Sequence, residues 1–363
     1  MTRPLRWLLA GPWDWNHYEE ASANALQRLG QTVVPFRWSS FFEGLGGRVE
    51  RKWTIVGPST RRMNAAMRRA IRESEPDVVL VWRGTHVLAQ TLAVARSARR
   101  VLISYNNDDP FSPAYSTGPL HYRRTWRLFR RTIPDYDIHL VYRPINVGEM
   151  RAAGAREVHI LPPYFVPEID ERVPLTPEDR EAYGCDIVFI GHYEPDGRFN
   201  TLKTLVDAGV RVRLFGTNWP AGTLERLRIG KGPVQPLRGA DYRKALCAAS
   251  MALCFLSRLN RDVYTRRIFE ITACGTLLMS ERTPELERWF ADGREAVFFS
   301  SPTELVSRVH ALLTMPEMID DIAAAGHARV HADGHSVDGR MEHLLSIVEP
   351  RFATPGKVHA VPG

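Results

Sequence analysis

Residues 260–275, Asn-Arg-Asp-Val-Tyr-Thr-Arg-Arg-Ile-Phe-Glu-Ile-Thr-Ala-Cys-Gly, decide the fold of this chain. They predict a short loop and one helix that ends at Gly275, just before a buried strand. Arg266, Arg267 and Glu270 are three or four residues apart and share a helix face. A helix start beside a strand end attracts anions, because unpaired N–H groups and the helix dipole point outward there. The arginines suit a diphosphate and the carboxylate suits ribose hydroxyls, although an ordinary surface helix with an Arg–Glu pair fits the same spacing.

Apolar strands alternate with amphipathic helices along the whole chain, which predicts parallel sheets covered on both faces. The expected strands of the first half are Leu5–Ala10, Thr32–Phe36, Val78–Trp82, Val101–Tyr105, Ile138–Tyr142 and Val158–Leu161. Those of the second half are Asp186–Ile190, Arg211–Phe215, Met251–Leu256, Thr276–Ser280 and Ala296–Phe299. Helical patterns between them include His17–Leu29, Arg61–Glu73 and Val87–Ala98. The fold class is therefore α/β, with two doubly wound halves.

From Asp241 to Val348 the chain resembles the C-terminal half of glycosyltransferases with the B-type (GT-B) fold. It is similar to the spore-maturation-protein (CgeB-like) group and to the group 1 type of C-terminal glycosyltransferase domain. The matching residues are Arg267–Gly275, Glu285–Phe290, Asp292–Val297, Ala323–Arg329 and Arg340. A weaker resemblance covers Phe189–Arg198 and Leu214–Trp219. The resemblance implies two Rossmann-like domains and a hexosyltransferase-like enzyme that uses a nucleotide sugar.

A chain of 363 residues suits two domains better than one core. We expect a Rossmann-like acceptor domain over residues 1–165, a linker over 166–180 and a donor domain over 181–335. The resemblance implies that a helix over 336–352 packs back on the first domain, and residues 353–363 are expected to form a mobile tail. Two such halves would turn their strand ends toward a shared cleft, where ligands of this architecture bind.

The second half is expected to hold the donor. Gly191 and Gly216 follow predicted strands, where a residue without Cβ lets the backbone approach a ligand. The resemblance implies that Arg198 grips the diphosphate, and a solvated loop is the alternative. The donor-binding candidates are Gly191, His192, Arg198, Gly216, Asn218, Asn260, Asp262, Arg266, Arg267 and Glu270.

Asp262 departs from the pattern of the retaining relatives. In that group two Glu residues lie eight positions apart, the first on the transferred sugar and the second on the ribose. Here Asp262 stands first, and Val263–Arg267 replace the usual glycine-rich stretch before Glu270. Asn260 and Arg261 are candidates to share the sugar contact, and the choice between inversion and retention stays open.

The first half is expected to hold the acceptor. The stretch 11–20, Gly-Pro-Trp-Asp-Trp-Asn-His-Tyr-Glu-Glu, follows the first strand, and its Trp13 and Trp15 suit stacking on sugar rings. His17 lies where the resemblance implies a catalytic base in inverting members, and an imidazole can take a proton from a hydroxyl near neutral pH. Asp108 or Asp109 would support it. A capped helix start and a turn fit the same residues.

Three further polar residues lie in loops that follow predicted strands. Arg83 and His86 come after the strand that ends at Trp82, and Asn107 follows the strand that ends at Tyr105. All three are acceptor-binding candidates, because the carboxyl ends of parallel strands share one edge of the sheet. A local turn explains Arg83 to His86 equally well.

The net charge of +7 favours anionic ligands, although an Arg-rich composition alone also explains it. Without a nucleic-acid motif we expect no nucleic-acid partner. The basic stretch 121–131 suits either a peripheral contact with anionic lipid or a solvated face. The sequence does not indicate the oligomeric state.

Four cysteines without a C-x-x-C pair argue against zinc and for a reduced, cytoplasmic setting. The chain has no apolar run long enough to span a membrane.

The sequence thus predicts a metal-independent glycosyltransferase that needs no cofactor beyond a nucleotide-diphosphate sugar as co-substrate. Cationic side chains and helix dipoles would offset the charge of the leaving group. The acceptor is a hydroxyl on a small molecule, a glycan or a lipid-linked sugar. A nucleotide-sugar epimerase or hydrolase of the same fold, and a non-catalytic nucleotide-sugar-binding scaffold, stay open as alternatives.

Overall fold

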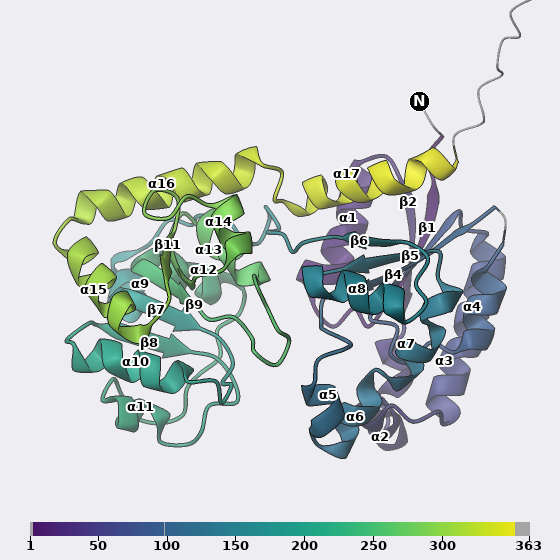
Figure 1. Cartoon of the computed structure of the whole chain (residues 1–363), viewed down its shortest axis with the longest axis horizontal. Coiled ribbons are helices and arrows are strands. Elements are labelled where there is room, and N and C mark those ends of the chain that lie inside the picture. Colours follow the sequence, from purple (N-terminus) through teal and green to yellow (C-terminus); the bar gives the residue numbers. More distant parts are fainter. Residues whose placement is uncertain (1–2, 98, 353–363) are drawn as a thin grey trace, which may run out of the picture. The chain divides into compact units, whose positions relative to one another are not determined.

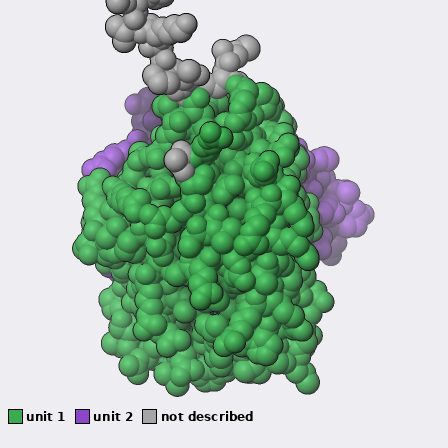
Figure 2. Space-filling view, turned by 90° about the vertical axis from the view of Figure 1, so that its right-hand side faces the viewer, with its two compact units in different colours: residues 1–162, 338–363 green, residues 163–337 purple. Residues whose placement is uncertain are grey.

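The computed structural model describes residues 3–97 and 99–352. The chain divides into two compact units. Unit 1 contains residues 1–162 and 338–363, and unit 2 contains residues 163–337, as Figure 2 colours them. Unit 2 thus begins ahead of the expected linker, and the tail predicted over 353–363 lies outside the described residues.

Unit 1 is built on a six-stranded parallel sheet of order β2-β1-β3-β4-β5-β6 (Figure 1). Its strands are β1 (Arg6–Gly11), β2 (Thr32–Arg37), β3 (Val78–Trp82), β4 (Val101–Asn106), β5 (Ile138–Val141) and β6 (Val158–Ile160). β3, β4 and β5 are buried at every position, as expected for central strands with helices on both faces.

The helices of unit 1 are η1 (Asn16–Glu20), α1 (Ala21–Arg28), η2 (Ser39–Phe42), α2 (Leu45–Trp53), α3 (Pro58–Ser74), α4 (Ala89–Ala95), α5 (Ala114–Thr117), α6 (Leu120–Thr125), α7 (Arg127–Thr132), η3 (Ile133–Asp135), α8 (Pro144–Ala152), α17 (Val337–Val348) and η4 (Glu349–Arg351). The basic stretch 121–131 is divided between α6 and α7 at Trp126. Trp126 and Phe129 are fully buried in the core, so these two aromatic residues are closed to a membrane. Arg28 pairs with Asp338 at 2.8 Å, and this ion pair links α17 to α1.

Unit 2 is built on a five-stranded parallel sheet of order β11-β10-β9-β7-β8. Its strands are β7 (Cys185–Ile190), β8 (Val212–Phe215), β9 (Ala249–Cys254), β10 (Leu277–Glu281) and β11 (Val297–Phe299). Its helices are α9 (Pro177–Tyr183), α10 (Arg198–Asp207), α11 (Thr223–Leu227), α12 (Gly239–Ala248), α13 (Arg266–Ala273), α14 (Pro284–Trp289), α15 (Pro302–Leu313) and α16 (Pro316–Ala332). α13 ends as predicted, because Gly275 adopts a left-handed φ of +69° that stops a helix.

Both sheets reverse their strand order once. In unit 1 the chain runs from β1 to β2 on one side and then to β3 on the other. In unit 2 it runs from β7 to β8 and then to β9. Ligands of open parallel sheets bind beyond the carboxyl ends of the strands at such a reversal. The predicted pair of doubly wound parallel sheets is confirmed, and each has one expected ligand edge.

Within the described ranges, 3–97 and 99–352, no helix combines the length and the apolar character needed to cross a bilayer.

Candidate functional site

Two glycines bring the ends of β7 and β8 into contact in unit 2. Gly216 has a φ of +141°, and a Cβ there would overlap the carbonyl oxygen of Gly191. The same oxygen accepts a hydrogen bond from Trp219 Nε1 at 2.9 Å. A Cβ on Gly191 would lie 2.7 Å from Arg267 Nη1. The absence of side chains at these glycines therefore lets the Arg267 guanidinium reach the reversal point of the sheet.

Glu270 is held by two side chains of α13 and by one side chain of α12. It pairs with Arg266, which also pairs with Asp170. Tyr242 Oη donates to Glu270 Oε2 at 2.7 Å, and Arg267 Nε lies 3.8 Å from that oxygen. Glu270 is 7% exposed, so this carboxylate has a fixed position. A carboxylate has about four acceptor sites, which leaves capacity for a ligand hydroxyl.

The loop after β9 borders a cavity of about 420 Å³. Arg261 in this loop has a φ of +50°, a left-handed conformation that is strained in a residue with a side chain. Asn260 N donates to Ser257 Oγ at 3.2 Å, and Asp262 N donates to the carbonyl of Ser257. The cavity is lined by Leu256, Ser257, Arg258, Arg261, Asp262, Glu281 and Arg282. Asp262 thus lies at the carboxyl edge of β9 and β10, as its position in the sequence predicted.

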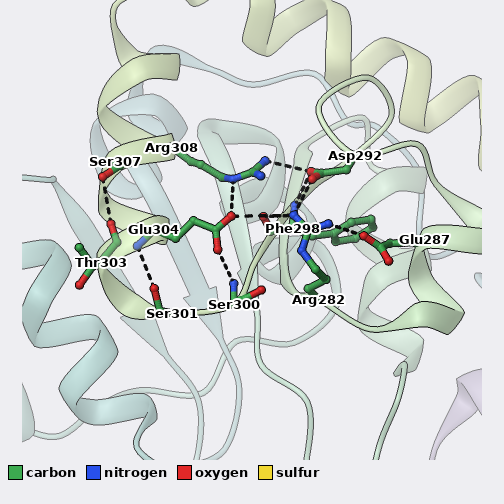
Figure 3. Close-up of polar contacts among 10 residues, drawn as sticks. All are labelled: Arg282, Glu287, Asp292, Phe298, Ser300, Ser301, Thr303, Glu304, Ser307 and Arg308. Carbon is green, nitrogen blue, oxygen red and sulfur yellow. Dashed lines mark hydrogen bonds and ion pairs between the residues drawn. The ribbon is translucent and has the colours of Figure 1, made fainter.

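Arg282, which lines this cavity, belongs to a network of ion pairs that Figure 3 shows. Its Nη2 lies 2.6 Å from Asp292 Oδ2, and Asp292 Oδ1 lies 3.0 Å from Arg308 Nη1. Glu304 Oε1 joins the network 3.0 Å from Arg308 Nε. Because Asp292 and Glu304 offset the charge of Arg282, the exposed Arg258 is better placed to attract an anion to this cavity.

Arg198 is engaged within its own loop. Its side chain is 4% exposed, and its Nη2 lies 2.6 Å from Asp196 Oδ2. Its Nη1 donates to the carbonyl of His192 at 2.6 Å, while His192 Nε2 lies 2.7 Å from Glu194 Oε1. Asn218, after β8, has a φ of +63°. A diphosphate contact by Arg198 stays a prediction, and the guanidinium that meets Gly191 is that of Arg267.

Unit 1 contains a buried acid that the sequence analysis did not single out. Glu19 lies in the π-helical turn η1 and is 1% exposed. Its Oε1 accepts a hydrogen bond from Trp13 N at 3.2 Å, and a Cβ on Gly11 would lie 2.4 Å from it. Burial raises the pKa of Glu19 to about 7. Single π-helical turns are frequent at functional sites, and this one follows the carboxyl end of β1.

The two aspartates after β4 have different surroundings. Asp108 Oδ2 lies 3.1 Å from Arg83 Nη2. Asp109 is fully buried, and its Oδ1 accepts hydrogen bonds from Phe111 N at 2.9 Å and Asn146 Nδ2 at 2.8 Å. Asp109 therefore orders the loop from inside, and the expectation that Asp108 or Asp109 supports a catalytic base stays a prediction. Asp108 remains the candidate that can face substrate.

His17 is half-buried among aromatic rings. Its ring lies 4.3 Å from that of Tyr18 and 5.9 Å from that of Trp15, measured between centroids. Trp15 is 49% exposed and can stack on a ligand, whereas Trp13 is covered by the Arg37 guanidinium at 4.9 Å. The role of His17 as a base stays a prediction.

His86 lies in the core of unit 1, and its role as an acceptor contact stays a prediction. It is 4% exposed and its ring lies about 5 Å from those of Trp38 and Phe42. Burial lowers the pKa of His86 to about 4, so it stays neutral at physiological pH. Asn107 accepts a hydrogen bond from Trp82 Nε1 at 3.3 Å, which holds the amide at the end of β3.

Among the residues that the structure describes, no group of three or more His, Cys, Asp or Glu side chains is arranged to hold a metal ion.

Residues 198–346 match the model of a family described as glycosyl transferase-like. These residues are therefore similar to a glycosyl transferase-like domain. The matched region includes Arg267, Glu270 and the loop after β9, whereas Gly191 lies just before it. No curated protein matches the sequence.

Solved structures of other proteins share the GT-B fold with this chain. HepE of Anabaena, solved with UDP and glucose, is 13% identical over 95% of this chain and 100% of its own, with a TM-score of 0.63. Sucrose-phosphate synthase of Thermosynechococcus elongatus is 12% identical over 96% of this chain and 99% of its own, with a TM-score of 0.67. At such identities the likeness establishes the fold, and the two parallel sheets agree with it.

Proposed function

We propose that this protein transfers a sugar from a nucleoside diphosphate sugar to a hydroxyl acceptor, with the donor bound by unit 2. The observation that carries the proposal is the placement of Glu270 and Arg267 at the strand reversal of a glycosyl transferase-like domain. The carboxylate of Glu270 suits the ribose of a nucleotide sugar, and the guanidinium of Arg267 suits its diphosphate. HepE of Anabaena, which has the same fold, was solved with UDP-glucose.

In this proposal the donor is held by complementary charges. Glu270 accepts hydrogen bonds from the ribose hydroxyls, since Arg266 and Tyr242 fix its carboxylate. Arg267 and the N-terminal turn of α13 bind the diphosphate and stabilise its charge as it leaves. These groups offset that charge without a metal ion.

The acceptor is proposed to bind unit 1 through Trp15, Asp108 and Arg83. Trp15 offers an exposed ring for stacking, and the Asp108–Arg83 pair can bind hydroxyl groups. With His17 as the base the anomeric centre inverts. Without a base a front-side course with retention is the alternative.

Thermal unfolding with a panel of nucleoside diphosphates and their sugars tests the donor site. A ligand of the native state raises the midpoint according to RT ln(1 + [L]/Kd). We expect a selective rise with one nucleotide, which Glu270→Gln abolishes and Glu317→Gln, an exposed control on α16, retains. Equal rises in wild type and Glu270→Gln would refute the donor assignment.

Product analysis separates transfer from the other reactions of this fold. The enzyme is incubated with the donor that binds, with and without a pool of hydroxyl acceptors. Transfer predicts sugar consumption only when an acceptor is present. Free sugar or an epimerised nucleotide sugar without acceptor would identify a hydrolase or an epimerase, and binding without turnover would identify a scaffold.

A further inference from the structure

Two cysteine thiols lie against each other beside the helix that carries Glu270. Cys247 belongs to α12, and Cys274 directly follows the last residue of α13. Cys247 Sγ lies 3.6 Å from the carbonyl oxygen of Cys274, which brings the two residues side by side. The remaining cysteines, Cys185 and Cys254, are buried in β7 and β9. The chain thus brings one pair of thiols together from positions 27 residues apart.

The two thiols have complementary chemical properties. The hydrogen bond from Cys274, the N–H of Val173 and the charges of Arg172 and Arg243 lower the pKa of Cys247 to about 7. Cys247 is half-buried, so a small reagent can reach a thiolate there. Cys274 is 1% exposed, and its hydrogen bond to Cys247 together with burial raises its pKa. One thiol is therefore suited to attack a reagent, and the other to resolve the product.

This pair connects the two elements that hold Glu270. Tyr242, on the same helix as Cys247, donates to Glu270 Oε2 at 2.7 Å. Cys274 N donates to the backbone carbonyl of Glu270 at 3.0 Å. A change in the distance between Cys247 and Cys274 therefore acts on both the side chain and the backbone of Glu270.

We propose that Cys247 and Cys274 form a reversible disulfide that regulates the ligand site at Glu270. The Cys247 thiolate attacks one sulfur of a small disulfide such as oxidised glutathione, and one glutathione leaves as thiolate. The Cys274 thiol then gives its proton to that thiolate or to solvent and attacks the Cys247 sulfur. The second glutathione leaves, so two protein thiols are oxidised while one disulfide is reduced to two thiols.

Forming this bond changes the geometry around Glu270. A disulfide holds its sulfurs about 2.05 Å apart, which is shorter than the contact between two thiols. The α12 helix must then approach the end of α13 and displace Tyr242 from its hydrogen bond. We expect the oxidised protein to bind the donor nucleotide at least about tenfold more weakly, which is the loss of roughly one hydrogen bond to a charged group. This last effect rests on the proposed function, whereas the disulfide does not.

Oxidation of the full chain by a glutathione redox series tests the bond itself. Free thiols are counted in denaturant and the disulfide is located by peptide mass spectrometry. We expect the count to fall from four to two, with Cys247 joined to Cys274 and no retained glutathione. Cys185→Ser, the matched control, still forms this disulfide, while Cys247→Ser keeps its three thiols. Cys274→Ser retains glutathione on Cys247.

Four free thiols across the series, or a stable glutathione adduct on wild-type Cys247, would overturn the disulfide. Nucleotide binding by the oxidised and re-reduced protein then tests regulation. Equal affinity of the two forms would overturn the regulatory role alone. Absence of any nucleotide binding by the reduced protein would instead contradict the proposed function, so the two failures are distinguishable.

Discussion

The strand reversals of the two units share a topology but differ in how their charges are arranged. At the reversal in unit 2, Glu270 is paired with Arg266 and hydrogen-bonded to Tyr242, and Arg267 reaches Gly191. At the reversal in unit 1, burial raises the pKa of the Glu19 carboxyl to about 7, and no cationic side chain of the described residues donates a hydrogen bond to it. A paired site is preorganised for a charged ligand, whereas a carboxyl that titrates near neutrality is suited to respond to protons. The same edge of one architecture can thus support two kinds of chemistry.

Among these predictions, a substitution at the contact between Gly216 and Gly191 in unit 2 should have the largest effect on the free energy of unfolding. Gly216→Ala places a Cβ against the backbone of Gly191 at a φ of +141°, so neither the backbone nor the new side chain can relax easily. We expect a loss of about 4 kcal/mol in the free energy of unfolding. Gly148→Ala is the control, since a Cβ there meets no atom within 4 Å in a helix, and it should stabilise by about 0.5 kcal/mol. Urea unfolding of both variants measures the difference between their free energies of unfolding. Equal stabilities of the two variants would contradict the close contact between Gly216 and Gly191.

The pH dependence of Glu19 tests the unit 1 side of the comparison. Its pKa is raised from 4.5 to about 7 in the folded state, so the folded protein keeps a proton that the unfolded chain has lost between these values. The contribution of Glu19 to the free energy of unfolding is therefore complete below about pH 4.5. This contribution is lost as the pH rises through 7. Glu19→Gln should remove this fall and be more stable than wild type above pH 7, by up to about 3 kcal/mol. Parallel unfolding curves of the two proteins at every pH would contradict a buried, proton-binding Glu19.

Substitutions of Arg267 and Arg198 distinguish a residue that binds the nucleotide from one that stabilises unit 2. Arg267→Ala should weaken binding of a nucleoside diphosphate by about 30-fold, since a charge-assisted hydrogen bond contributes about 2 kcal/mol. Arg198→Ala should instead lower stability, because it leaves the buried Asp196 without its partner. Titration calorimetry and urea unfolding on both variants separate the roles. A larger loss of affinity in Arg198→Ala would restore the diphosphate role that the sequence predicted for it.

The smallest effect is expected at Trp15. This ring is 49% exposed, so Trp15→Ala should change stability by less than about 0.5 kcal/mol. Loss of stacking should raise the KM for the acceptor roughly fivefold and leave that for the donor unchanged. Initial rates with each substrate varied in turn provide the test. A rise in the donor KM alone would place the acceptor elsewhere.

The sequence predicted the layers of the fold because buried parallel strands are continuous apolar runs. All eleven expected strands appear, with no end shifted by more than two residues. Gly191 and Gly216 could be grouped because each follows a strand, and Arg267 and Glu270 because they share one helix face. Such local signals require no knowledge of distant contacts.

The missing parts of the site depend on distant contacts or irregular turns. Tyr242 is 28 residues from Glu270 and Asp170 is 96 from Arg266, so no local pattern indicates either partner. Glu19 was quoted within the stretch 11–20, but a π-helical turn does not follow the 3.6-residue period that predicts facing residues. His86 appeared to lie in an accessible loop, while Trp38 and Phe42 from another part of the chain bury it.

A crystal structure with the nucleoside diphosphate that gives the largest thermal shift tests the central claim most directly. The account predicts the ribose hydroxyls on Glu270 and the diphosphate between Gly191, Arg267 and the start of α13. A nucleotide bound at any other edge of unit 2, with Glu270 still enclosed by Arg266 and Tyr242 alone, would contradict it.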